Sequence, residues 1–146
     1  MYFIDRIKKI LKWIPIIWKD RDFDYIFLLE IIKFKLKSME EFFNSKYAMS
    51  MNSNKRAEEI HKCILILNRI IDDDYIEIAF KHHDKKWGEL NFKNNKFSCP
   101  NANTEEEIKQ EHKERFRLYK HSDILLDQDI DYFFKLLRKH FRSWWD

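Results

Sequence analysis

The stretch FDYIFLLEIIKFKLKSMEEFFN, residues 23–44, decides the fold class. Its apolar residues recur at steps of three and four, which is the period of an α-helix. They form two stripes, a main one from Tyr25 to Phe43 and a second one from Phe23 to Phe34. A helix that is apolar on two sides lies at the centre of a bundle or at a subunit interface. The stretch therefore predicts an all-α protein and favours a homo-oligomer.

The composition of the rest of the chain agrees with this fold class. Gly88 is the only glycine in 146 residues, and there are two prolines. All-β folds need many glycine-containing turns, and glycine-rich phosphate-binding loops need several glycines at fixed spacing. An all-β fold and a glycine-rich phosphate-binding loop are therefore excluded. The length suits one domain, so we expect a single helical domain over residues 1–146, a bundle of about five helices.

Four further helical segments follow from periodicity and end signals. Pro15 and Gly88 are natural helix ends, and three consecutive acids predict an irregular turn at residues 72–74. The expected segments are residues 3–14; 53–87 with an interruption at 72–74; 104–120; and a last helix from Ser122 or Asp123 onward. The first is basic and amphipathic. We expect its apolar face to pack on the rest of the domain, since that is commoner than lying on a membrane.

Charge and cysteine usage limit the classes of partner. The formal net charge is +3, and the charges interleave without a basic stripe, so we expect no DNA or RNA partner. No run approaches the ~20 apolar residues of a membrane helix, and we expect no membrane partner. Cys63 and Cys99 lack metal-ligand spacing. They predict a reducing compartment, with no metal and no cofactor.

The histidines offer one enzymatic alternative. His61, His83-Asp84 and a later aspartate (Asp123, Asp127, Asp129 or Asp131) follow the order found in HD phosphohydrolases. In those all-helical enzymes, His and carboxylate side chains hold a divalent metal that activates water. Exposed histidines on charged helices explain the same pattern more simply. We therefore predict no catalytic residues and keep the metal-dependent phosphohydrolase as an alternative.

Three segments place aromatic rings next to charged side chains. They are residues 18–25, residues 85–87 and residues 138–145. Such rings can stack on nucleobases while Lys and Arg bind phosphate. From the residues alone, core or interface anchoring of these rings is the favoured interpretation. The adjacent Trp144 and Trp145 are hard to bury together in a monomer, so we expect one of them to face a partner subunit or a ligand.

A set of motifs along nearly the whole chain resembles a widespread family of small tailed-phage proteins. The motifs are Trp18-Lys19-Asp20, Asp22 to Tyr25, Phe34-Lys35-Leu36, Lys86-Trp87-Gly88, Tyr119-Lys120-His121, Asp129 to Tyr132 through Lys139-His140, and Trp144-Trp145-Asp146. That family in turn is similar to phage immune-evasion sponges. These are small oligomeric helical proteins that sequester the cyclic dinucleotides of bacterial CBASS defence.

The resemblance implies a viral protein that captures a signal such as 3′,3′-cGAMP without cleaving it, in the cytoplasm of an infected bacterial host. Within the matching motifs, side-chain chemistry suggests the contacts. Aromatic rings would stack on the purines: Trp18, Tyr25, Trp87 or Trp144. Basic groups would meet the phosphates: Lys35, Lys86 or Arg138. Asp22 or Asp24 would accept from a guanine edge or a ribose hydroxyl. A third possibility is a structural or interaction protein of the phage that docks through residues 18–25.

Overall fold

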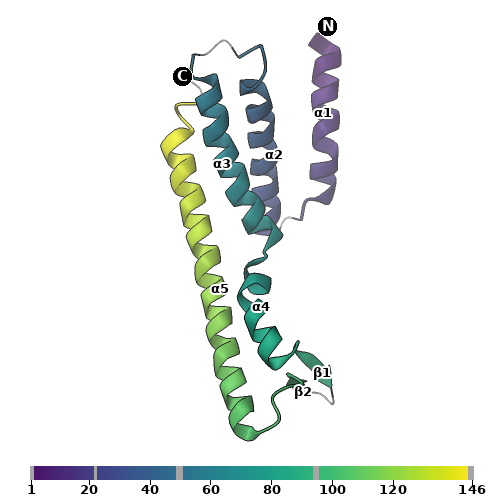
Figure 1. Ribbon diagram of the computed structural model, residues 1–146. Coiled ribbons are helices and arrows are strands. Elements are labelled where there is room, and N and C mark those ends of the chain that lie inside the picture. The colour runs from purple at the N-terminus through teal and green to yellow at the C-terminus, as the bar shows by residue number, and fades with distance from the viewer. Residues whose placement is uncertain (1, 22, 49–50, 94–95, 145–146) are drawn as a thin grey trace. The chain divides into compact units, whose positions relative to one another are not determined.

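The computed structural model describes residues 2–21, 23–48, 51–93 and 96–144. These residues contain five helices and one two-stranded sheet (Figure 1), which confirms the all-α prediction. The elements are α1 (Tyr2–Lys19), α2 (Tyr25–Phe43), α3 (Ser53–Asp72), α4 (Tyr75–Trp87), β1 (Asn91–Lys93), β2 (Lys96–Ser98) and α5 (Glu105–His140).

The chain divides into two compact units. The first unit comprises Met1–Ile71 together with Lys135–Asp146, and the second comprises Asp72–Phe134. Helix α5 contributes to both, since its last residues belong to the first unit.

The core of the first unit lies where α2 and α3 run antiparallel, side by side (Figure 1). Asp24 caps α2 by accepting a hydrogen bond from the amide of Ile26 at 3.0 Å. The main stripe of α2 is buried at Leu29, Leu36 and Phe43. Helix α3 contributes Ala57, Ile60, Cys63, Ile64, Ile66, Leu67 and Ile70. The buried residues of α2 all lie on its predicted main stripe, whereas Tyr25 and Leu28 of the same stripe are exposed.

Helix α1 differs from the prediction in two ways. It continues through Pro15 to Lys19, although proline removes one hydrogen bond inside a helix. The carbonyl deprived of a donor is that of Leu11, an exposed residue that water can reach. The predicted apolar face, extended by Ile17 and Trp18, is also exposed and does not pack on the domain. We call it the apolar stripe, and it consists of Phe3, Ile4, Ile7, Ile10, Leu11, Ile14, Ile17 and Trp18.

The second unit begins with the predicted interruption. Asp73 has a positive φ of 51°, and it separates α3 from α4. Gly88, with a φ of 77°, closes α4 as expected. Part of the segment between the helices expected at residues 53–87 and 104–120 is an antiparallel hairpin, in which Phe92 pairs with Phe97 at a ring-centroid distance of 4.7 Å. Strands of three residues are too short to show a recognisable alternating pattern, so no strand was expected here.

One continuous helix replaces the two expected over residues 104–120 and from residue 122 onward. A capping box opens it: the Glu107 amide donates to Thr104 Oγ1 at 3.2 Å, and the Thr104 amide donates to Glu107 Oε2 at 2.9 Å. Ser122 does not begin a new helix. Its hydroxyl donates to the carbonyl of Tyr119 at 2.8 Å, an interaction that a serine can make inside a helix.

Candidate functional site

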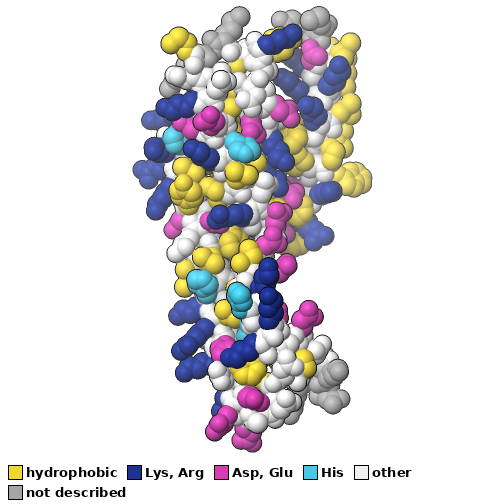
Figure 2. All heavy atoms as spheres, viewed as in Figure 1, with side chains coloured by type: hydrophobic (Ala, Val, Ile, Leu, Met, Phe, Trp, Pro, Cys, Tyr) yellow, Lys and Arg dark blue, Asp and Glu magenta, His cyan; other side chains and the backbone are white. Residues whose placement is uncertain are grey.

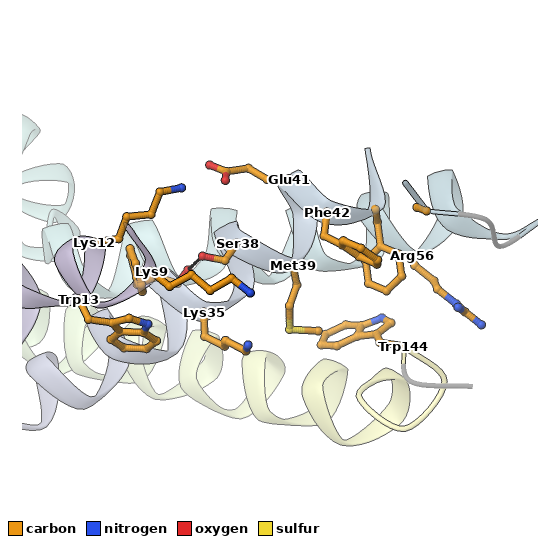
Figure 3. Close-up of a pocket in the computed structure, with 13 residues that line it drawn as sticks. Lys9, Lys12, Trp13, Lys35, Ser38, Met39, Glu41, Phe42, Arg56 and Trp144 are labelled. Atoms are coloured by element: carbon orange, nitrogen blue, oxygen red, sulfur yellow. Dashed lines mark hydrogen bonds between the residues drawn. The ribbon is translucent and has the colours of Figure 1, made fainter. Parts of the chain in front are cut away.

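The main cavity of the first unit has a volume of about 610 Å³, within the ~300–1,000 Å³ typical of small-ligand sites. We call it the basic pocket. Helices α1 and α2 supply most of its wall, and residues from the start of α3 and from the chain after α5 complete it (Figure 3). The charged and aromatic lining residues are Lys9, Lys12, Lys35, Arg56 and Glu41, with Trp13, Phe34, Phe42, Phe43 and Trp144.

The α1 side of the basic pocket is fixed by an aromatic contact. The rings of Trp13 and Phe34 meet edge to face, with centroids 4.5 Å apart. Lys9 lies one turn before Trp13 on the same side of α1, because residues four apart share a helix face. The side chains of Lys9 and Lys35 extend toward the middle of the pocket (Figure 3). Two ammonium groups from different helices thus approach the same space.

The opposite end of the basic pocket is built around Trp144. This indole is only 3% exposed, and its Nε1–H donates to Glu59 Oε2 at 3.2 Å. Glu59 Oε2 also lies 3.3 Å from His140 Nδ1, which ties the end of α5 to α3. Met39 extends toward the indole (Figure 3). The guanidinium of Arg56 lies over the ring of Phe43 at 5.8 Å. Trp144 is therefore a fixed wall of the pocket.

The charge of the lining selects the kind of ligand. Four basic groups and one carboxylate give the pocket an excess of positive charge, which favours anions. The aromatic surfaces beside them suit a planar, partly apolar ligand. Chemically, the arrangement fits a molecule that carries both phosphate and aromatic bases.

The predicted site residues fall into four groups. Lys35 and Trp144 line the basic pocket. Trp18, Tyr25 and Arg138 are exposed residues of the first unit that do not line it. Lys86 and Trp87 belong to the second unit, and Asp22 lies outside the described residues. Two of the seven described positions thus line the basic pocket.

Lys86 and Trp87 instead anchor α4 to α5. The buried indole of Trp87 donates to Glu114 Oε2 at 2.7 Å, and Lys86 Nζ lies 2.9 Å from Glu114 Oε1. Lys86 also stands over the Trp87 ring at 4.4 Å. The hydrogen bond from Trp87, followed by that from Lys86, lowers the pKa of Glu114 to about 2. For these two residues the anchoring interpretation is the one that the contacts support.

A buried polar cluster in the second unit was missed by the sequence analysis. Glu111 is 1% exposed. Its Oε2 accepts from Arg115 Nη2 at 2.7 Å, its Oε1 accepts from the Cys99 thiol at 3.3 Å, and Oε1 also lies 3.4 Å from His83 Nε2. Burial, followed by the bond to Glu111, raises the pKa of Cys99 to about 11. The cysteine is thus held as a neutral thiol, which is a poor nucleophile.

Of the residues of the phosphohydrolase alternative, His61 contacts a glutamate outside that set, whereas His83 and Asp84 contact each other. His61 Nδ1 lies 2.8 Å from Glu40 Oε1 in the first unit. His83 is buried in the second unit, with Nδ1 3.3 Å from Asp84 Oδ1. Among the residues that the structure describes, no group of three His, Cys, Asp or Glu side chains could hold a metal ion.

The sequence analysis also missed most of the lining, including Lys9, Lys12, Trp13, Phe42 and Arg56. The available signal was Trp13, an aromatic residue outside the apolar face of α1. No family model, curated protein or solved structure matches the chain. The resemblance to phage sponges therefore stays a prediction, and the basic pocket is the feature that bears on function.

Proposed function

We propose that the chain is a phage immune-evasion protein that binds and sequesters a cyclic nucleotide signal of CBASS defence, such as 3′,3′-cGAMP, without cleaving it. The observation that supports this proposal is the basic pocket, where four cations and several aromatic rings surround one cavity. A cyclic dinucleotide presents two anionic phosphodiesters and two planar bases, so it matches both features of the lining.

Different side chains of the basic pocket would bind the phosphodiesters and the bases. Lys9 and Lys35, whose ammonium groups extend toward the middle of the pocket (Figure 3), would contact the phosphodiesters. The exposed ring of Phe42 and the half-buried ring of Trp13 would stack on the bases. Each stacked base contributes on the order of 1–3 kcal/mol. Contacts of this number and strength are sufficient for capture without any chemical step.

Capture without cleavage is favoured by the lining itself. Among the described residues it includes Ser38 and Glu41 but neither histidine nor cysteine. The Ser38 hydroxyl donates to the carbonyl of Phe34 at 3.2 Å. Within the described part of the chain it has no hydrogen bond to a base of the kind that nucleophilic catalysis requires. The protein would act stoichiometrically in the cytoplasm of an infected bacterium, and assembly into a homo-oligomer would shield the bound nucleotide further.

The test is recovery of the nucleotide after binding. The full chain is incubated with 3′,3′-cGAMP, separated from free nucleotide, denatured by heat, and the released material is identified by mass spectrometry. We expect intact 3′,3′-cGAMP in proportion to the protein. Lys9→Ala should lower the recovered amount at limiting nucleotide at least several-fold, because it removes a cation from the pocket.

Lys8→Ala is the matched control. Lys8 is the neighbouring exposed lysine of α1 and does not line the pocket, so its removal should leave recovery unchanged. A linear dinucleotide or mononucleotides in the released material would favour the phosphohydrolase alternative. Absence of any retained nucleotide would refute the proposal.

A further inference from the structure

The apolar stripe of α1 has no partner within the first unit. Its eight side chains are between 40% and 87% exposed. Figure 2 shows hydrophobic side chains along the outer edge of α1. Only Trp13 and Ile16 of this helix are partly buried among the described side chains. At ~100° per residue, Ile16 lies on the side opposite the centre of the stripe, with Trp13 beside it. Helix α1 therefore contacts α2 through the side that carries Trp13 and Ile16, and its apolar stripe stays exposed to water.

The stripe has the width and the borders of an interfacial helix. It covers about 140° of the helix circumference at ~100° per residue, which is broader than a coiled-coil seam. Basic residues flank it on both sides, Arg6 on one border and Lys8 and Lys19 on the other. Trp18, the most exposed residue of the stripe, is of the type enriched at membrane–water interfaces. Long basic side chains at such borders can reach lipid head groups while the stem stays on the apolar surface.

Charge decides which partner covers the stripe. Five of the 28 Lys and Arg residues lie in α1 but only one of the 25 Asp and Glu residues, Asp5, which leaves 23 basic and 24 acidic residues elsewhere. A second copy would bring another basic α1 or an electrically balanced surface. An anionic bilayer supplies the opposite charge and an apolar layer at once. No helix of the described chain is long and apolar enough to span a bilayer, so the contact is with the surface.

We propose that α1 binds the surface of anionic lipid bilayers, with the apolar stripe inserted at the level of the head groups and Arg6, Lys8 and Lys19 contacting lipid phosphates. This departs from the sequence expectation of no membrane partner. That expectation assumed that the apolar face packs on the domain, which the exposure of the stripe contradicts. The basic pocket uses the other side of α1, so the two sites do not compete.

The experiment is co-sedimentation of the full chain with sucrose-loaded vesicles. We expect binding to vesicles of phosphatidylcholine with 30% phosphatidylglycerol, weak binding to pure phosphatidylcholine, and a loss of binding in 0.5 M NaCl. Ile10→Asp should lower the partition coefficient at least tenfold, since it places a charge in the stripe. Lys8→Glu should lower it several-fold through charge alone. Loss of the lipid-induced blue shift of tryptophan emission in Trp18→Phe would place that ring in the bilayer.

Ile78→Asp is the matched control, because Ile78 is similarly exposed on α4: 69% against 61% for Ile10. It should bind vesicles like the wild type. Equal binding by Ile10→Asp and the wild type, or no preference for the anionic vesicles, would overturn the proposal. The stripe would instead join two copies if the wild type does not bind vesicles and Ile10→Asp has a lower molar mass in solution than the wild type. That combination would also overturn the proposal. Nucleotide recovery by Ile10→Asp should be unchanged, which separates this test from that of the basic pocket.

Discussion

At the residue scale, the cluster around Glu111 shows how a buried charge is held in the second unit. The carboxylate is enclosed and depends on Arg115, whose Nη2 lies 2.7 Å away. Removing one partner of a buried ion pair leaves the other charge without compensation, which is far costlier than losing an exposed pair. The thiol of Cys99 remains as a donor but carries no positive charge, and the ring nitrogens of His83 and His112 lie farther from the carboxylate than Arg115 does, at 3.4 Å and 3.6 Å.

Arg115→Ala should therefore lower the free energy of unfolding by about 3–5 kcal/mol, measured by urea denaturation. Arg117→Ala is the control, because Arg117 is an exposed residue of the same helix, and surface changes of this kind stay within about 0.5 kcal/mol. Similar losses in the two variants would contradict the role of Arg115.

Glu114 gives the second unit a pH dependence. Its pKa is lowered from 4.5 to about 2 by Trp87 and Lys86. A lowered pKa in the folded state means that the ionised carboxylate stabilises the fold above pH 4.5, and that this contribution is lost as the pH falls toward 2. The melting temperature of the wild type should exceed that of Glu114→Gln at pH 6, and the difference should shrink between pH 4.5 and 2. A difference that is constant over this range would argue against the assignment.

At the element scale, the ends of helices were predictable where one residue sets the backbone. Gly88 ends α4 because glycine tolerates a positive φ, and the Thr104–Glu107 box begins α5 because its side chains bind free backbone amides. The fate of Pro15 and Ser122 was not predictable in the same way. Whether a proline interrupts a helix depends on the solvation of the carbonyl that loses its donor. A serine can cap a helix or lie inside one, where its hydroxyl bonds to a backbone carbonyl. Those outcomes depend on surroundings that the local sequence does not contain.

Gly88 offers a test of how α4 joins the hairpin. Its φ of 77° is unfavourable for other residues, and a Cβ there would stand 2.5 Å from Pro100 Cγ. Gly88→Ala should lower the free energy of unfolding by more than ~1 kcal/mol. Because Pro100→Ala removes the clashing atoms, the double variant should lose less than the sum of the two single losses. Additive losses in thermal or urea unfolding would contradict the close approach.

At the scale of the whole molecule, the sequence indicated candidate basic and aromatic side chains but not which of them come together. Lys35 and Trp144 were predicted because they combine charge and aromatic surface. Lys9 and Lys12 were missed because they belong to a polar helix face that the sequence assigns to solvent. The basic pocket joins positions from residue 9 to residue 144, and only tertiary packing brings such distant positions together. The apolar stripe was recognised, but its exposure could not be read from periodicity.

The measurement that tests the central claim most directly is calorimetric titration of the full chain with 3′,3′-cGAMP. We predict saturable binding that Lys35→Ala weakens at least tenfold, or about 1.4 kcal/mol. Lys37→Ala, which removes an exposed lysine of α2 outside the pocket, should leave the affinity unchanged. Absence of binding by the wild type, or the same affinity in the wild type and Lys35→Ala, would contradict nucleotide capture in the basic pocket.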